Sequence, residues 1–154
     1  MDYIKKIQKW KNEGKKIVFT NGCFDIIHAG HVDYLEKAKS LGDILVVGLN
    51  SDSSISRIKG TKRPIVNQDY RKRVLEALKS VDLVVVFDED TPLRLIKEIK
   101  PDVLVKGGDW SIENIVGADF VQSYGGEVKT IDFIYDISTS KIIEKIVDRY
   151  CEKD

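Results

Sequence analysis

The chain has 154 residues, of which 42% are hydrophobic and 32% charged, and its 25 lysines and arginines balance its 25 aspartates and glutamates. A chain of this length and apolar content is expected to form one domain with a substantial core. The zero net charge argues against a surface built throughout to hold nucleic acid or anionic lipid, because such a surface needs a basic excess.

Short apolar runs alternate with amphipathic segments along the chain. Apolar residues three or four positions apart predict helices, and brief apolar runs predict strands buried on both faces. In the first half we expect, in order, a helix over residues 2–13, a strand over 16–20, a helix over 31–41, a strand over 44–49, an irregular polar stretch over 50–66 with room for one short helix, a helix capped by Asn67, and a strand over 83–87. Trp10, on the first helix, either packs on the sheet or serves a subunit contact.

The second half repeats this alternation. Thr91 offers an N-cap hydroxyl and Pro92 suits a first helical position, which predicts a helix that Pro101 ends. Beyond it we expect a strand over 103–105, a helix near 117–124, a strand over 128–131, and a final helix from near Ser138 that carries Ile142, Ile143, Ile146 and Val147. The pattern predicts an α/β fold, a single doubly wound, Rossmann-like domain over residues 1–154 in which helices cover both faces of a parallel five-stranded sheet. Such folds bind ligands at the carboxyl ends of their strands, which here are followed by the loops 20–31, 50–66, 106–116 and 132–140.

The only two histidines of the chain, His28 and His31, lie three residues apart in the first of these loops. They open a helix, whose N-terminal N–H groups attract phosphate, and their imidazoles add donors whose charge can respond to a bound anion. Neither the G-x-G-x-x-G fingerprint nor the G-x-x-x-x-G-K-[ST] phosphate loop is present. The histidines could instead simply cap the helix, or bind a metal together with Cys23 and Asp25.

Two motifs carry a family resemblance. The stretch Gly22-Cys23-Phe24-Asp25-Ile26-Ile27-His28-Ala29-Gly30-His31 resembles the G-x-F-D-x-x-H-x-G-H signature of the cytidylyltransferase-like nucleotidyltransferases at every fixed position. Near the C-terminus, Ile137-Ser138-Thr139-Ser140-Lys141-Ile142 is similar to the second family motif, I-S-T-T-K-I, although on its own it would be an ordinary helix cap. The arginine that many members carry shortly before the second motif is missing, which weakens the match to the cytidylyltransferase subgroup.

The resemblance also implies roles for individual residues. His28, His31 and Lys59 would be catalytic, the histidines holding the α/β-phosphate region and Lys59 closing over the phosphates from a mobile loop. The segment Lys106-Gly107-Gly108-Asp109-Trp110 corresponds to the nucleoside-binding loop, although by itself it would be a plain turn. Contacts to nucleotide or phosphate are expected from Thr20, Asn21, Gly22, Cys23, Phe24, Asp25, Gly30, Arg71, Lys106, Gly107, Asp109, Ser138, Thr139 and Ser140.

Longer blocks narrow the resemblance to the adenylyltransferases of ADP-heptose synthesis. These blocks include 57–65, 101–110, 115–117 and 125–128, and the similarity runs from about residue 15 to about residue 147. It implies the reaction of ATP with D-glycero-β-D-manno-heptose 1-phosphate, with Mg²⁺ held by the triphosphate and no protein ligand for the metal. It also implies a homodimer that is functionally coupled to a separate sugar kinase.

Other functions stay open from the residues alone. A cytidylyltransferase would use CTP with glycerol 3-phosphate or phosphoethanolamine, and a non-catalytic module would bind ATP without turnover. Residues 57–73 hold seven cations and one anion, a local charge of +6 that suits a triphosphate and a sugar phosphate. Tyr70 is the one aromatic residue of that segment, so we expect no nucleic-acid partner.

The location of the protein is predicted from what the sequence lacks. The two cysteines, Cys23 and Cys151, form no disulfide framework. No stretch approaches the roughly 20 apolar residues of a membrane span, and the first residues lack the apolar core of a secretory signal. We therefore expect a cytoplasmic protein without membrane contact.

Overall fold

The computed structural model describes residues 2–108 and 110–151 of the chain. Over these residues five parallel strands form one sheet in the order β3-β2-β1-β4-β5. The strands are β1 (Ile17–Gly22), β2 (Ile44–Asn50), β3 (Leu83–Phe87), β4 (Val103–Gly107) and β5 (Glu127–Ile131). The predicted five-stranded, doubly wound α/β fold is confirmed, because the strand order reverses between β1 and β4.

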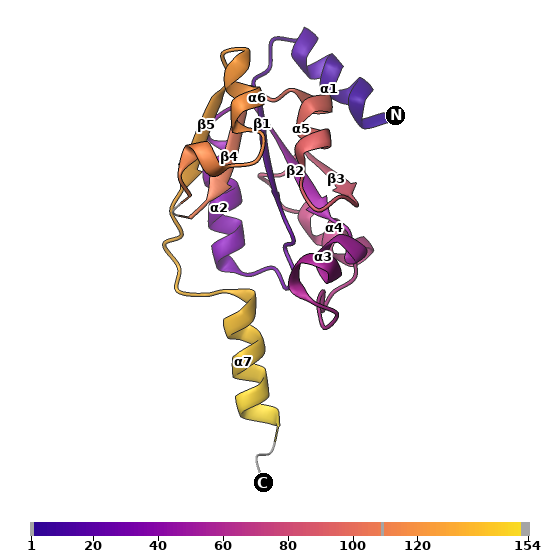
Figure 1. Cartoon of the computed structure of the whole chain (residues 1–154), viewed down its shortest axis with the longest axis vertical. Helices are drawn as coiled ribbons and strands as arrows, with labels where there is room; N and C mark the ends of the chain where they lie inside the picture. The colour runs from indigo at the N-terminus through magenta and orange to yellow at the C-terminus, as the bar shows by residue number, and fades with distance from the viewer. Residues whose placement is uncertain (1, 109, 152–154) are drawn as a thin grey trace.

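Helices cover both faces of this sheet (Figure 1). One face packs against α1 (Asp2–Asn12), α5 (Leu93–Ile99) and α6 (Ala118–Ser123), and the other against α2 (Ala29–Lys39) and α4 (Gln68–Glu76). The remaining helical elements are α3 (Asp52–Lys59), the short 3-10 helix η1 (Ile112–Asn114) and α7 (Thr139–Tyr150). The side chain of Asn67 accepts a hydrogen bond at the start of α4, so its predicted capping role is confirmed.

The strands read as continuous apolar runs because both of their faces are buried. In β1, Ile17 and Phe19 contribute to the core on one face, whereas Val18 contributes to the core on the other. All three side chains are fully buried. Trp10 of α1 packs, partly buried, against the first of these cores, which confirms the packing alternative for that residue.

The sheet opens at the point where its strand order reverses. β1 pairs with β2 along its whole length, from Ile17 to Gly22, but pairs with β4 only through Val18 and Phe19. Beyond these positions β1 and β4 separate toward their carboxyl ends. Such a switch point is where doubly wound folds bind ligands, so the loops after β1 and β4 border the expected site.

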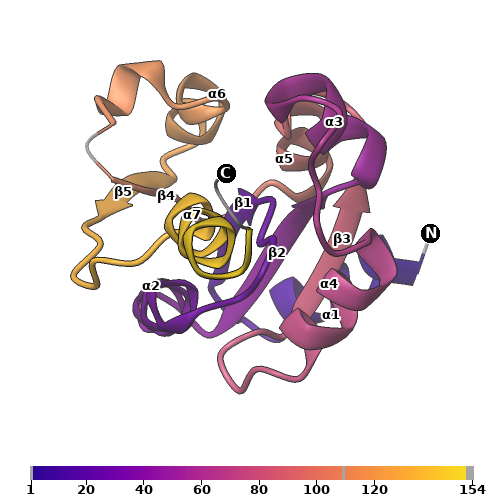
Figure 2. The same cartoon turned by 90° about the horizontal axis from the view of Figure 1, so that it is seen from below.

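Two details of the helices differ from the sequence prediction. Thr91 does not cap α5: Pro92 occupies the N-cap position without a side-chain hydrogen bond, and the helix begins at Leu93. α7 does not cover the sheet, because it extends away from the body of the domain and has no buried residue (Figure 1). Seen from below, α7 stands end-on in front of the carboxyl ends of the strands (Figure 2). Among the described residues, no helix combines the length and the apolar character needed to span a bilayer.

Candidate active site

The loop after β1 holds two residues in an unusual backbone conformation. Phe24 and Ile26 have φ angles of 47° and 57°, in the left-handed region that non-glycine residues rarely adopt. Strain of this kind costs on the order of 1–3 kcal/mol per residue and persists only where the surroundings hold it. Between these two residues Asp25 is buried, and its backbone carbonyl accepts a hydrogen bond from the Thr139 hydroxyl. The loop is therefore fixed to the start of α7.

His28 and His31 cap α2 with one nitrogen each and keep the other nitrogen as a donor. The Nδ1 of His28 accepts from the backbone N–H of Gly30 at 3.1 Å, and the Nδ1 of His31 accepts from the backbone N–H of His28 at 3.3 Å. A neutral imidazole whose Nδ1 accepts a hydrogen bond must carry its proton on Nε2. Both rings therefore present an Nε2–H donor, so capping and phosphate binding are compatible.

The two imidazoles are also stacked, and their surroundings keep them neutral. Their ring centroids lie 3.8 Å apart with an interplanar angle of 26°, and the Phe24 ring packs edge-on against His31. Burial lowers the pKa of His28, and burial together with the neighbouring His28 lowers the pKa of His31 from 6.5 to about 4. At pH 7 the ligand-free site therefore holds two uncharged donors.

A cavity of about 350 Å³ joins the segments that the sequence motifs identified. It is bordered by the loop after β1, the end of α3, the loop that follows α3, and the segment leading into α7. The residues that line it are Cys23, Phe24, Asp25, His28, His31, Lys59, Arg63, Phe133, Ile137, Ser138, Thr139 and Ser140. Nine of these residues, Lys59 among them, were expected from the sequence to have a catalytic or binding role. Arg63, Phe133 and Ile137 were not expected.

The second motif forms the start of α7 and one wall of this cavity. The side chain of Ser138 accepts a hydrogen bond from the backbone N–H of Lys141 at 3.1 Å, so Ser138 is the N-cap of a 12-residue helix. Ser138, Thr139 and Ser140 all border the cavity. The N-terminus of α7 thus brings hydroxyls and the positive end of a helix dipole to the site that holds the two histidines.

The opposite wall carries the positive charge. Lys59 is the last residue of α3, rather than part of a loop as expected, and Gly60 ends that helix with a φ of 98°. Arg63 follows in the next turn, and its Nε donates to the buried carboxylate of Asp25 at 2.9 Å. The sequence offered a signal for Arg63, the excess of cations over residues 57–73, but nothing that distinguished it from its neighbours.

Arg71 does not line the cavity, contrary to its expected contact with phosphate. Its side chain is 1% exposed and lies within the protein. The guanidinium donates to the carbonyl oxygens of Cys23, Asn50 and Val66 and to the carboxylate of Asp52, each at 2.8 Å. These bonds join the loop after β1, the end of β2 and the start of α3, so the structure gives Arg71 a positioning role.

The other described residues that were expected at the site are not among those that line the cavity. The Thr20 hydroxyl is buried and bonds the Tyr34 hydroxyl at 2.6 Å, while burial raises the pKa of Tyr34 to about 12. Gly107 lies against the ring of Phe133, and Lys106 places its ammonium over the Trp110 ring at 5.5 Å. Asn21 and Gly22 end β1, and Gly30 lies in the first turn of α2 against the His28 ring. Asp109 lies outside the described residues.

The alternative of a metal site finds little support in the side chains. Among residues 2–108 and 110–151, no group of three or more histidine, cysteine, aspartate or glutamate side chains could hold a metal ion. The carboxylate of Asp25 is already occupied, because it accepts from Arg63 and from the backbone N–H groups of Ile65 and Val66. Burial also raises the pKa of Cys23, which keeps its thiol protonated.

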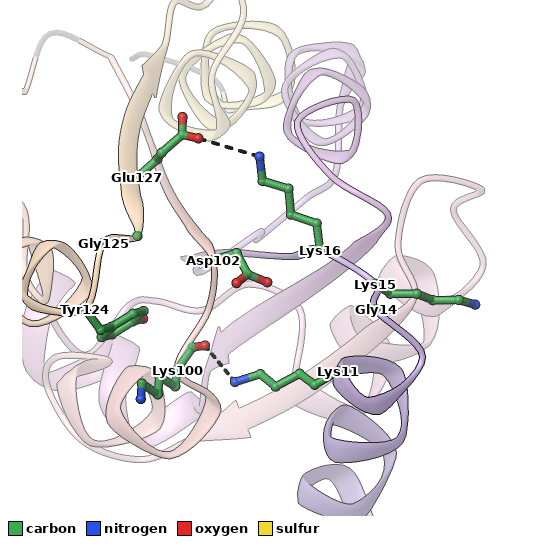
Figure 3. A pocket seen from close by; sticks show the side chains of 10 residues that line it. Lys11, Gly14, Lys15, Lys16, Lys100, Asp102, Tyr124, Gly125 and Glu127 are labelled. Atoms are coloured by element: carbon green, nitrogen blue, oxygen red, sulfur yellow. Dashed lines mark hydrogen bonds and ion pairs between the residues drawn. The ribbon is translucent and has the colours of Figure 1, made fainter.

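A larger cavity, of about 590 Å³, lies at the opposite edge of the sheet (Figure 3). Several lysines border it, and two of them are already bound to other residues of the chain. Lys11 donates to the carbonyl oxygens of Ile99 and Lys100, and Lys16 pairs with Glu127. Because this cavity lies at the amino ends of the strands and contains neither motif, the smaller cavity is the better candidate for the active site.

A family model and several known proteins resemble this chain over most of its length. The model of the cytidylyltransferase-like family matches residues 19–145, a span that includes both motifs. A solved structure, the lipopolysaccharide core biosynthesis protein from Thermoplasma volcanium, superposes with a TM-score of 0.64 at 33% sequence identity. That match covers 80% of this chain and 100% of the other.

Curated relatives are more similar in sequence but much longer. The bifunctional protein HldE of Geobacter metallireducens is 58% identical over 147 residues, which cover 96% of this chain and 30% of the relative. The bifunctional protein HldE of Alcanivorax borkumensis is 59% identical over 143 residues, which cover 93% of this chain and 30% of the relative. The chain therefore spans less than a third of the length of these relatives.

Proposed function

The chain belongs to the cytidylyltransferase-like family of nucleotidyltransferases, and from that premise we propose that it transfers AMP from ATP to D-glycero-β-D-manno-heptose 1-phosphate. The products are ADP-heptose, a precursor of the lipopolysaccharide core, and pyrophosphate. One observation carries the proposal: a single cavity holds the Nε2–H donors of His28 and His31, the start of α7, and the cations of Lys59 and Arg63. Hydrogen-bond donors, a helix N-terminus and cations are the groups that bind the oxygens of a polyphosphate.

The reaction requires positioning and charge stabilisation more than proton transfer. A sugar phosphate is already anionic at pH 7, so its oxygen can attack the α-phosphorus of ATP without a general base. An O–P bond forms to the sugar phosphate, and the bond between the α-phosphorus and its bridging oxygen breaks to release pyrophosphate. The Nε2–H groups of His28 and His31 donate to oxygens that gain charge in the transition state, while Lys59 stabilises the departing pyrophosphate.

Mg²⁺ would accompany the triphosphate as its counter-ion and would neutralise part of its charge. The cavity fits a metal held by phosphate oxygens and water better than one held by the protein. Asp25 is the one carboxylate among the described residues that line the cavity, and three donors occupy it. We therefore assign no metal ligand to the chain.

The choice of acceptor rests on relatives rather than on the cavity. The similarity to bifunctional HldE proteins and to a lipopolysaccharide core biosynthesis protein supports a heptose phosphate. The relatives are described as bifunctional and extend well beyond the matched region, which supports coupling of this chain to a second activity, and we propose that this activity is a sugar kinase. We also propose that two copies pair, because α7 exposes the large apolar side chains of Ile146, Val147 and Tyr150.

A crossed substrate assay tests the proposal. The full chain is supplied with ATP or CTP, each combined with heptose 1-phosphate, glycerol 3-phosphate or phosphoethanolamine, and the release of pyrophosphate is followed. We expect ATP with heptose 1-phosphate to give the highest kcat/KM. Faster turnover of CTP with glycerol 3-phosphate or phosphoethanolamine would replace the heptose assignment, and ATP binding without pyrophosphate release would indicate a non-catalytic module.

A further inference from the structure

Arg63 faces the candidate active site from a position that neither motif includes. Its side chain is 16% exposed, and it borders the same cavity as His28, His31 and Lys59. Both histidines are neutral at pH 7 because their pKa values are lowered, whereas a guanidinium stays protonated at any pH that a folded protein tolerates. Arg63 and Lys59 are therefore the sources of fixed positive charge among the described lining residues.

Asp25 holds Arg63 in one orientation. The Oδ2 of Asp25 accepts from the Nε of Arg63 at 2.9 Å and from the N–H of Ile65 at 2.8 Å, while its Oδ1 accepts from the N–H of Val66 at 2.9 Å. Burial would raise the pKa of Asp25, but these three hydrogen bonds outweigh it and lower the pKa. At neutral pH the carboxylate is therefore a charged anchor that fixes both the loop and the arginine.

The bonding of Arg63 differs from that of the other paired arginines. Within the described part of the chain, Arg57, Arg71 and Arg94 each donate to protein oxygens through at least one terminal nitrogen. Among the described residues, Arg63 is held by a side-chain hydrogen bond through Nε alone, so both of its terminal nitrogens are left for another acceptor. Two parallel N–H groups match two oxygens of a phosphate, a geometry that lysine cannot supply.

We infer that Arg63 binds a phosphate group of the substrate through its two terminal nitrogens, and that Asp25 is the positioning residue that aims it. The inference rests on the proposed function for the presence of a phosphorylated substrate in this cavity. That phosphate could belong to the nucleotide or to the sugar phosphate, because both are anions of the same chemistry. Separate binding measurements distinguish these two sources.

The test compares Arg63→Gln and Arg63→Lys with two controls that remove one positive charge from the same basic segment. Lys62→Gln changes an exposed neighbour that does not border the cavity, and Arg57→Gln changes an arginine paired with Asp90. Calorimetry of the full-length variants with ATP, inorganic pyrophosphate and heptose 1-phosphate measures affinity, and the pyrophosphate assay gives kcat and KM.

For Arg63→Gln we expect the affinity for one phosphorylated ligand, and the corresponding kcat/KM, to fall about 10- to 100-fold. Arg63→Lys should recover only part of this loss, and both controls should stay within about twofold of the wild type. Weaker binding of ATP and pyrophosphate assigns the contact to the nucleotide, and weaker binding of heptose 1-phosphate assigns it to the acceptor. Unchanged affinity for all three ligands overturns the inference.

A double-mutant cycle tests the role of Asp25. Asp25→Asn should weaken binding in the wild-type background but have little further effect in the Arg63→Gln background, because the two residues act as a unit. Equal losses in both backgrounds would show that Asp25 acts only on the fold and would overturn its positioning role. If Asp25→Asn does not fold, Arg63→Gln and its controls still decide the contact itself.

The two proposals fail in distinguishable ways. If the wild type binds ATP or pyrophosphate but turns over none of the substrate pairs, the proposed function fails. The effect of Arg63→Gln on binding then still tests the inference. A wild type that binds none of the three ligands contradicts both.

Discussion

The clearest structural prediction concerns Arg71, which the sequence suggests as a phosphate ligand and the structure places within the protein. In Arg71→Met the aliphatic part of the side chain is retained, but the donors to three backbone carbonyls and to Asp52 are lost. The Asp52 side chain is 41% exposed, so water can replace the guanidinium there. Loss of the hydrogen bonds to the three carbonyls accounts for most of the decrease in the free energy of unfolding, at about 1 kcal/mol each.

We therefore expect Arg71→Met to lower the free energy of unfolding by about 3 kcal/mol, which corresponds to a decrease of about 6–12 °C in Tm. Urea denaturation followed by far-UV circular dichroism measures the loss. Arg73→Met is the matched control, because Arg73 is an exposed residue of the same helix and its replacement should change stability by less than about 0.5 kcal/mol. A variant as stable as the wild type but more than tenfold weaker in ATP binding would show that Arg71 contacts phosphate and would refute this reasoning.

Three further predictions follow from the site and from α7. The pKa of His31 is lowered from 6.5 to about 4 in the folded protein, so protonation of its ring opposes folding. The free energy of unfolding should therefore fall as the pH decreases from 6.5 toward 4, by less than about 3 kcal/mol because the ring is partly exposed. Thermal melts at several pH values measure this loss, and bound pyrophosphate should reduce it. A Cβ on Gly30 would lie 3.0 Å from the His28 ring, so Gly30→Ala should displace the imidazole. We expect this variant to stay folded and its kcat/KM to fall by about 10- to 100-fold. Unchanged kinetics would contradict the assigned role of His28. Light scattering should find a wild-type dimer and an Ile146→Glu monomer, whereas a monomeric wild type would contradict pairing through α7.

The sheet could be predicted from the sequence because its strands are short apolar runs separated by amphipathic helices. Every strand end lies within one residue of its expected position, except the carboxyl ends of β1 and β4, which extend two residues further than expected. Those extensions carry polar residues and glycines, which the apolar pattern does not include. α7 begins next to Ser138 as predicted, but its apolar spacing is that of a packed helix, and a periodic pattern does not specify what covers the apolar face.

The two motifs indicate the candidate site, but residue spacing could not assign a role to every residue within it. The histidines and the hydroxyls of the second motif meet in one cavity, as the resemblance implied. Arg63 and Arg71 are eight positions apart in the same basic segment, and one borders the cavity while the other is buried. The contacts that distinguish the two arginines run to the loop after β1, 38 and 48 residues away along the chain, a separation over which residue spacing has no predictive value.

We propose that nucleotidyl transfer takes place between the two histidines and the start of α7. Its most direct test uses ATP labelled with ³²P at the α-phosphate, together with heptose 1-phosphate, and compares the wild type with the double variant His28→Ala, His31→Ala. We predict that the wild type transfers the label to ADP-heptose and that the double variant, with its fold intact by circular dichroism, is slower by at least about 100- to 1,000-fold, because it lacks two preorganised donors. Transfer of the label at a near wild-type rate by the folded double variant would contradict the account.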